Sequence, residues 1–570
     1  MNQPVIPIIL AAATKQRKRQ APKGRVADPQ SLDEVQALLG PRPWRRDLLI
    51  EYLHAVNDRY GQLGAPHLAA LAKLMKLAQT EVYEVATFYH HFDVVKEGAD
   101  GSVAAPAALT VRVCDGLSCE MAGAKHLLER LPTILGRDVR VIPAPCVGRC
   151  EQAPAVVVHH QPVPYATVEA VQSLVQAGHT RHEPEPYLGL DDYVAEGGYA
   201  LLRDCVAGRR SIDSVLATME DSGLRGLGGA GFPAGRKWRI VRGEPAPRLM
   251  AVNIDEGEPG TFKDRWYLER DPHRFLEGML IASWAVGIAA IYIYLRDEYH
   301  GCRALLEAEL AKLRANPPVP DLPLIELRRG AGAYICGEES AMIESIEGKR
   351  GMPRLRPPYV AQVGLFGRPT LEHNMETLYW VRDILEKGAE WFAGHGRNGR
   401  KGLRSFSVSG RVVKPGVHLA PAGITVRELI DEFCGGMLPG HELYGYLPGG
   451  ASGGILPASL DNVPLDFDTL QPHGCFIGSA AVIILSQHDR ARDAALNLMR
   501  FFADESCGQC TPCRVGTQKA VGLLARPAWD TALLAELSQV MIDASICGLG
   551  QAAPNPITCV IKYFPQELTE

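Results

Sequence analysis

Eight of the fourteen cysteines in this 570-residue chain fall into two tight groups. The first group reads C-x4-C and then C-x3-C, and each loop follows a predicted strand. These loops are wider than the C-x2-C knuckles usual for structural zinc, and wide loops suit a two-iron rhombus. We therefore predict a [2Fe-2S] cluster, with a zinc ribbon or unliganded core cysteines as alternatives. The predicted ligands are Cys114, Cys119, Cys146 and Cys150.

The second group has the spacing C-x2-C-x2-C, which lets one loop bind three corners of a cubane cluster. A fourth ligand is needed, and Cys547, flanked by glycines one helical hairpin later, can fold back to supply it. We predict a [4Fe-4S] cluster held by Cys507, Cys510, Cys513 and Cys547. Zinc is the alternative, although structural zinc sites usually pair their ligands two and two. The remaining six cysteines are scattered and are expected in the core.

A glycine-rich loop between residues 226 and 231 matches G-x-G-x-x-G. The residues before it, 211–221, have a helical pattern, whereas a Rossmann fingerprint must leave a strand. We expect a different nucleotide loop, in which Gly226, Gly228 and Gly229 let the backbone approach a planar ring or phosphates. Lys237 follows with a mobile positive charge. A purely structural turn is the alternative.

Two polar segments follow predicted strands at 249–252 and 324–327. Because α/β sheets place ligands at the carboxyl ends of their strands, we expect these segments and the glycine loop to converge. Their carboxylates suit ribityl or ribose hydroxyls and a nicotinamide carboxamide, which donate hydrogen bonds. A solvated acidic face is the alternative. The candidates are Asn253, Asp255, Glu256, Glu258, Tyr334, Gly337, Glu338 and Glu339.

The composition excludes several classes of protein. With 46% hydrophobic and 22% charged residues, the chain is neither mainly disordered nor collagenous nor a coiled coil. A net charge of -5 is too near balance to predict a nucleic-acid or membrane partner. Cysteine is far below a disulfide-framework level and no export signal is visible, so we expect a cytoplasmic protein.

One uncharged run, residues 278–295, is long enough to be tested against a membrane span. Gly287 divides it into a helical half and a β-rich half, which favours helix, turn and strand within a soluble core.

The periodicities predict an α/β multidomain chain. A basic tail precedes a helical unit, a small α/β domain, a large α/β domain, a β-rich insert and a helical bundle. The predicted ranges are 1–30, 31–100, 106–180, 190–405, 406–485 and 486–570, in that order.

Four motifs together resemble the flavin-bearing, NADH-oxidising subunit of respiratory complex I. They lie at residues 222–238, 255–264, 332–339 and 505–514. Residues 31–180 resemble the thioredoxin-like partner subunit with one [2Fe-2S] centre. Fusions of these two occur in diaphorase subunits of NAD-reducing hydrogenases and NAD-dependent formate dehydrogenases. Over its whole length the chain is most similar to the β subunit of molybdenum- or tungsten-dependent formate dehydrogenases, and residues 406–485 resemble a soluble ligand-binding β-grasp domain.

The resemblance implies FMN and NAD(H) as cofactors and assigns roles to residues. Gly226, Gly228, Gly229, Lys237, Asn253, Asp255 and Glu256 are expected around FMN, with Asn374 on its phosphate side. Gly337 and Glu338 are expected nearest the flavin and nicotinamide, with Phe232 stacking on the dinucleotide and Glu258 near it. Tyr334 and Glu339 are further cofactor-binding candidates. Glu338, Lys237 and Glu258 are the expected catalytic set. Two positions depart from the family pattern: His373 stands where complex I members commonly have a second Asn, and Leu227 stands where they commonly have Arg. His373 is nevertheless included among the cofactor-binding candidates.

The predicted function is hydride exchange between NAD(H) and FMN with single-electron transfer to the [4Fe-4S] cluster, while the [2Fe-2S] cluster acts as a side reservoir. A separate α subunit carrying a molybdenum or tungsten pterin and further clusters would oxidise formate. A hydrogenase or complex I diaphorase is the alternative within the same chemistry, and a zinc-binding scaffold is the alternative from another class.

Overall fold

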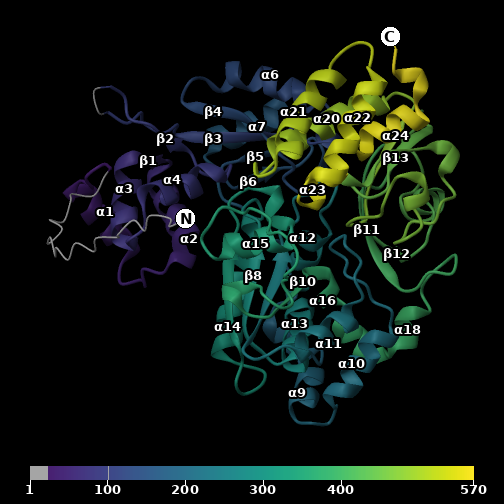
Figure 1. Ribbon diagram of the computed structural model, residues 1–570, viewed down its shortest axis with the longest axis horizontal. Helices are drawn as coiled ribbons and strands as arrows, with labels where there is room; N and C mark the ends of the chain where they lie inside the picture. The colour runs from purple at the N-terminus through teal and green to yellow at the C-terminus, as the bar shows by residue number, and fades with distance from the viewer. Residues whose placement is uncertain (1–23, 100–101, 570) are drawn as a thin grey trace, which may run out of the picture.

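The computed structural model describes residues 24–99 and 102–569 (Figure 1). Most of the predicted tail, residues 1–30, lies outside the described residues. The rest forms the expected multidomain α/β protein, with a thioredoxin-like domain, a larger α/β domain, a β-rich insert and C-terminal helices. In Figure 1 the C-terminal helices, in yellow, lie beside both the thioredoxin-like domain and the insert.

The N-terminal unit consists of four helices and a short parallel strand pair. Its apolar side chains Val35, Leu53 and Val56 are almost completely buried. Ion pairs attach the unit to the large α/β domain, since Arg328 Nη2 lies 2.7 Å from Asp47 Oδ2. The elements are α1 (Pro29–Leu39), α2 (Leu49–Tyr60), β1 (Leu63–Gly64), α3 (Ala65–Met75), α4 (Gln79–Phe88) and β2 (Val94–Val95).

The thioredoxin-like domain is a four-stranded sheet in the order β4-β3-β5-β6. Val111, Val113 and Val156 are fully buried in its core, as the period-two pattern predicts. Strands β3 and β4 are parallel with Cys114 opposite Ala144, so the loops after both strands leave the same edge. The elements are β3 (Leu109–Cys114), α5 (Leu117–Met121), α6 (Ala124–Leu135), β4 (Val139–Ala144), β5 (Val156–Val158), β6 (Gln161–Val163) and α7 (Val168–Ala177).

The large α/β domain contains a fully parallel sheet in the order β10-β7-β8-β9. Its strands are β7 (Arg248–Ile254), β8 (Ile288–Leu295), β9 (Leu324–Arg329) and β10 (Thr370–Asn374). Its helices are α8 (Leu190–Ala195), α9 (Ala200–Val206), α10 (Ile212–Asp221), α11 (Ala234–Gly243), α12 (Lys263–Leu268), α13 (Pro272–Val286), α14 (His300–Ala315), α15 (Glu339–Ile346), α16 (Met375–Tyr379), α17 (Val381–Lys387) and α18 (Ala389–Ala393).

Helix α13 and strand β8 explain the uncharged run. Asp271 caps α13 by accepting a hydrogen bond from Arg274 N, and Gly287 ends it with φ at 75°. Almost every residue of α13 is buried, and Gly278 lies against the Leu378 carbonyl. A helix that is buried on all sides can be apolar all round. None of the described helices is long and apolar enough to cross a membrane.

The insert is a five-stranded sheet in the order β12-β11-β15-β13-β14, and helices follow it to the end of the chain. The insert contains β11 (Leu403–Gly410), β12 (Gly416–Pro421), α19 (Val426–Glu428), β13 (Leu443–Leu447), β14 (Leu456–Pro457) and β15 (Ala481–Ser486). The last helices are α20 (Ala491–Asp504), α21 (Thr511–Leu524), α22 (Thr531–Ala544), α23 (Gly548–Ala552) and α24 (Asn555–Tyr563).

Candidate functional site

The first cysteine group converges in a buried cluster at the edge of the thioredoxin-like sheet. Cys146 Sγ lies 3.3 Å from Cys150 Sγ, and Cys114 forms thiol contacts with both Cys119 and Cys146. The four thiols are therefore gathered at one place, as the ligands of one metal centre must be.

The loop that carries Cys146 is bound to the large α/β domain. Arg296 Nη2 donates to the Cys146 carbonyl at 2.6 Å, and Arg265 Nε donates to the Gly148 carbonyl at 2.9 Å. Hydrogen bonds with Cys114 and Cys150 hold the pKa of the Cys146 thiol well below its usual value, and the charge of Arg296 adds to this effect against burial. The same contacts raise the pKa of Cys114 and Cys150 well above the usual value, so Cys146 is the thiol of these three that ionises most readily.

The second cysteine group lies where α21 and α23 begin. Cys510 and Cys547 stand at the N-terminal caps of these two helices. A Cβ atom at Gly550 would lie only 2.8 Å from Cys513 Cβ, so glycine lets α23 approach the other cysteines. Burial raises the pKa of Cys513 to about 11 and that of Cys547 to about 12. A cationic iron centre would supply the charge that favours thiolates here.

The glycine loop follows helix α10, as the sequence predicts, and packs onto the end of β10. A Cβ atom at Gly228 would lie 2.9 Å from Asn374 Cβ. Leu227 N donates to Thr377 Oγ1 at 2.9 Å, and the Leu227 side chain is buried. The position at which complex I members commonly have arginine is therefore part of the apolar core in this chain.

The three predicted loops converge at the carboxyl ends of β7 and β10. Asn253 lies opposite Asn374 in the parallel register. Its Nδ2 donates to the Gly337 carbonyl at 2.9 Å, which joins the loop after β7 to the loop after β9. Lys237 Nζ donates to the Glu372 carbonyl at 3.1 Å, which brings the helix after the glycine loop to the same place.

Two buried carboxyl groups in this cluster lack partners for one oxygen each, Asp255 Oδ2 and Glu372 Oε2. Burial raises the pKa of both carboxyls well above the ordinary range. Ribityl hydroxyls can satisfy such oxygens, so the residues present fit FMN. The sequence analysis missed Glu372 because it lies within a strand; its position two residues before Asn374 was the available signal.

The insert contributes to the cluster through the loop before β14. Ser452 N and Oγ donate to Glu258 Oε1 at 2.8 and 2.6 Å, and the Tyr334 hydroxyl donates to Glu258 Oε2. Burial raises the pKa of Glu258 despite these hydrogen bonds. Sequence reasoning did not find Ser452, because nothing in its local pattern distinguishes it from a turn.

The remaining predicted residues include two glutamates that fix the loop after β9. Glu338 caps α15 by accepting from Ser340 N at 2.9 Å and Ala341 N at 3.0 Å, and Arg356 binds its other oxygen. Arg356 also lies 2.8 Å from Glu339 Oε1. Phe232 is 38% exposed, and the Arg236 guanidinium lies 5.7 Å from its ring centroid, so part of the ring is accessible for stacking on a planar group.

Two predicted cofactor residues use their polar atoms inside the protein instead. Glu256 accepts hydrogen bonds from Asp264 N at 2.8 Å and Tyr299 Oη at 2.8 Å, so its carboxylate caps α12. His373 accepts from the Trp238 indole at 2.8 Å, and burial keeps its pKa well below the ordinary value. Both Glu256 oxygens are therefore engaged inside the protein, whereas Trp238 engages only Nε2 of His373, so His373 stays a cofactor candidate and Glu256 does not.

Gly228→Ala is expected to reduce the FMN content of the purified chain severely, because the added methyl group would displace Asn374 from the loop. The flavin-to-protein absorbance ratio measures this effect. The matched control is Gly243→Ala at the end of α11, where an added Cβ meets nothing within 4 Å. Equal flavin content in both variants would remove Gly228 from the cofactor site.

Comparison with known proteins agrees with this geometry. The chain matches the Nuo51 FMN-binding domain at residues 219–383, the NADH-ubiquinone oxidoreductase-F iron-sulfur binding region at 493–570, and the thioredoxin-like [2Fe-2S] ferredoxin family at 35–179. An NADH-quinone oxidoreductase subunit of Rhizobium meliloti (strain 1021) is 39% identical over 398 residues, which cover 67% of this chain and 94% of the relative. The chain belongs to the 51 kDa flavoprotein family of NADH-quinone oxidoreductases.

Two further relatives extend the comparison. The mitochondrial NADH dehydrogenase [ubiquinone] flavoprotein 1 of Dictyostelium discoideum is 41% identical over 377 residues, covering 63% of this chain and 78% of that protein. The crystal structure of an NAD+-reducing [NiFe]-hydrogenase in the H2-reduced state contains a chain with a TM-score of 0.81 and 32% identity, covering 92% of this flavoprotein and 93% of that chain. The cofactors of this flavoprotein are FMN, NAD(H), one [2Fe-2S] and one [4Fe-4S] cluster.

Proposed function

We propose that this flavoprotein exchanges hydride between NAD(H) and FMN and passes electrons singly to a partner subunit through the [4Fe-4S] cluster. The observation that carries the proposal is a direct connection between the nucleotide loops and the cluster loop. Tyr334 N donates to Glu505 Oε2 at 2.8 Å, and Glu505 lies two residues before Cys507. The rings of Tyr334 and Phe501 also pack at 4.9 Å. In this proposal the [2Fe-2S] cluster lies off the route from the flavin to the partner subunit and acts as an electron reservoir.

The bound flavin supplies the ability to take two electrons as hydride and release them one at a time. The protein's own residues bind and orient the reactants. Asp255 and Glu372 would accept hydrogen bonds from hydroxyl groups of the bound flavin, and Lys237 would provide positive charge at the same place. Glu258, fixed by Ser452 and Tyr334, would orient the nicotinamide, while Phe232 would stack on the dinucleotide.

We assign the [2Fe-2S] cluster to Cys114, Cys119, Cys146 and Cys150, and the [4Fe-4S] cluster to Cys507, Cys510, Cys513 and Cys547. The matches to the thioredoxin-like [2Fe-2S] ferredoxin family and to the NADH-ubiquinone oxidoreductase-F iron-sulfur binding region support iron clusters over the zinc scaffold. Dithionite-reduced samples should give iron–sulfur EPR signals, which zinc does not produce.

For the partner, we propose a formate-oxidising subunit with a molybdenum or tungsten pterin, from the whole-chain resemblance to formate dehydrogenase β subunits. An NAD+-reducing hydrogenase partner is the second candidate, because the hydrogenase chain aligns over 92% of this flavoprotein, including its N-terminal part. Co-purification of the native complex tests the choice. Molybdenum or tungsten with formate-dependent NAD+ reduction supports the first, and nickel with hydrogen-dependent reduction supports the second.

The isolated chain should reduce an artificial acceptor with NADH and show no oxidation of formate. Formate oxidation by this polypeptide alone would contradict the assignment of that reaction to a separate subunit.

Glu338→Gln is expected to raise the KM for NADH about ten-fold while FMN remains bound, because the carboxylate that caps α15 and pairs with Arg356 holds this loop in position, and an amide weakens both contacts. Steady-state kinetics with an artificial acceptor measure the change, and the exposed Glu390→Gln serves as the control. Unchanged kinetics would exclude Glu338 from the nicotinamide site.

A further inference from the structure

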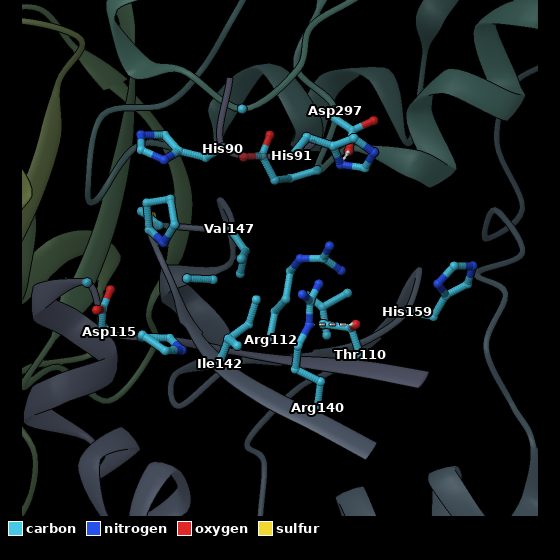
Figure 2. Close-up of a pocket in the computed structure, with 18 of the residues that line it drawn as sticks. His90, His91, Thr110, Arg112, Asp115, Arg140, Ile142, Val147, His159 and Asp297 are labelled. Carbon is cyan, nitrogen blue, oxygen red and sulfur yellow. Dashed lines mark hydrogen bonds and ion pairs between the residues drawn. The ribbon is translucent and has the colours of Figure 1, made fainter. Parts of the chain in front are cut away.

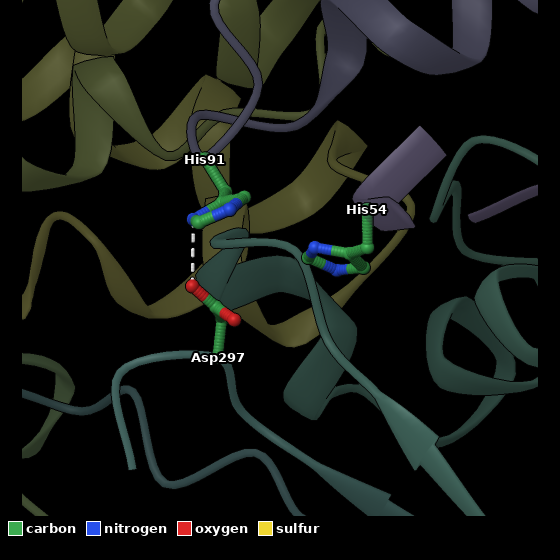
Figure 3. A group of neighbouring side chains, drawn as sticks. All are labelled: His54, His91 and Asp297. Atoms are coloured by element: carbon green, nitrogen blue, oxygen red, sulfur yellow. Dashed lines mark ion pairs between the residues drawn. The ribbon is translucent and has the colours of Figure 1, made fainter. Parts of the chain in front are cut away.

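A cavity of about 710 Å³ lies where the N-terminal unit, the thioredoxin-like domain and the large α/β domain meet (Figure 2). His91 and Asp297 lie on one side of it, and Arg112 extends toward the interior from β3. Gly332, at the start of the loop after β9, and Cys146 of the first cysteine group also line it, so the cavity borders both of those features. Beside it, three side chains from three distant segments meet: His54 from α2, His91 from the loop after α4, and Asp297 from the loop after β8 (Figure 3).

Each histidine has one ring nitrogen used and one free. His54 Nε2 lies 2.9 Å from the Gly330 carbonyl, so this nitrogen must carry the proton and donate. His91 Nδ1 lies 2.6 Å from Asp297 Oδ2, so this nitrogen carries the proton in the same way. The opposite nitrogens, His54 Nδ1 and His91 Nε2, are buried and have no partner. Each ring therefore keeps one unpartnered nitrogen, and the two ring centroids are 4.9 Å apart.

This arrangement is the one that metal-binding histidines show. A ligating imidazole almost always donates its second ring N–H to a carboxylate or a backbone carbonyl, which fixes the tautomer and the ring orientation. Here Asp297 has that role for His91, and the Gly330 carbonyl has it for His54. One polar side-chain atom from each of His54, His91 and Asp297 lies within 4.8 Å of the others, and the two imidazole centroids are 4.9 Å apart, so the two histidines are near enough to share one ion.

The surrounding contacts make the arrangement rigid. His90 N donates to the Gly332 carbonyl at 3.0 Å and His91 N donates to the Ala331 carbonyl at 3.1 Å, so the His91 backbone is fixed to the large domain. The His54 side chain is 2% exposed, and burial lowers its pKa well below the ordinary value, so the ring is neutral as metal binding requires.

Asp297 orients His91 instead of ligating directly, because both of its oxygens are in use. Arg329 Nε binds Asp297 Oδ1 at 2.5 Å, and Arg303 Nη1 lies 3.6 Å from the same oxygen. Although burial alone would raise it, the charge of Arg329 and the hydrogen bond from His91 hold the pKa of Asp297 well below the ordinary range. The arginines oppose cation binding, so affinity must come from the nitrogen ligands.

We propose that His54 and His91, with Asp297 oriented behind His91, bind one divalent transition-metal ion of the zinc class, with water from the cavity completing its coordination. Nitrogen ligands select zinc, nickel or cobalt over magnesium and calcium, which prefer oxygen. The ion would join the N-terminal unit to the large α/β domain. This site is distinct from the two cysteine clusters and does not depend on the proposed function.

The test uses the full chain with its clusters, treated with a chelator, desalted and then equilibrated with zinc chloride. Zinc and iron are counted together by mass spectrometry. We expect one zinc per chain with the iron content unchanged and no competition from magnesium. His54→Gln and His91→Gln, which keep a donor toward Gly330 and Asp297, should lose this zinc. Asp297→Asn should weaken zinc binding by about 10- to 100-fold.

The matched control is His90→Gln, since His90 is the neighbour of His91 but its side chain is 51% exposed. Zinc-edge X-ray absorption on the wild-type chain gives a readout independent of variant folding. Nitrogen or oxygen neighbours at about 2.0–2.1 Å support the site, whereas sulfur at about 2.3 Å would place the zinc in a cysteine group. A sulfur shell, no bound zinc, or equal zinc in the wild type and both histidine variants overturns the proposal.

Discussion

Cys513→Ser is expected to remove about four iron atoms per chain while FMN stays bound, because the proposed [4Fe-4S] cluster loses one of its four cysteine ligands. Cys513 is 4% exposed and lies against Gly550 of α23, so no solvent group can replace the thiolate easily. Electron transfer from NADH to the natural partner should fall to background. Hydride transfer to the flavin should persist, because the nucleotide loops are not altered.

Iron analysis and flavin absorbance on the same sample check this prediction. The matched control is Cys205→Ser, which changes another buried cysteine remote from both clusters. If Cys513→Ser retained full iron content, the second cysteine group would not be the [4Fe-4S] site.

Lys263→Met is expected to destabilise the large α/β domain by about 3–5 kcal/mol, because it leaves buried carboxylates without their partner. Lys263 Nζ lies 2.7 Å from Asp264 Oδ1 and 3.1 Å from Glu376 Oε2, and all three side chains are nearly inaccessible to solvent. Against the cost of burial, the carboxylates around it raise the pKa of Lys263 above its ordinary value.

Thermal unfolding followed by flavin release measures this loss. The control is Lys312→Met, whose ammonium is half-exposed and pairs with Glu309 at 2.8 Å, so its effect should stay below about 1 kcal/mol. Adding Glu376→Gln to Lys263→Met should recover part of the stability, since one unpaired charge disappears. Equal melting temperatures for Lys263→Met and Lys312→Met would contradict the importance of this buried pair.

The cofactor chemistry could be predicted because its residues are close together in the chain. Ligand spacing within a loop is a local property, and so is a run of glycines after a helix. The convergence of the polar loops could also be predicted, because strands β7 and β10 are parallel and their carboxyl ends meet at one edge. Glu256 lies in the expected loop, yet its carboxylate caps α12, and only packing determines which way a loop side chain faces.

Contacts between distant segments could not be predicted in this way. Ser452 reaches Glu258 across 194 residues, and His54 meets the Gly330 carbonyl across 276. The sequence by itself determined the chemistry: two cysteine groups, a glycine loop and carboxylates at strand ends. Tertiary structure alone decided which carboxyl oxygens stay unpartnered and which histidine nitrogens are bare. The physical reason is that hydrogen bonding and burial depend on the three-dimensional neighbours of a side chain, and one-dimensional spacing specifies only neighbours within the same loop or helix.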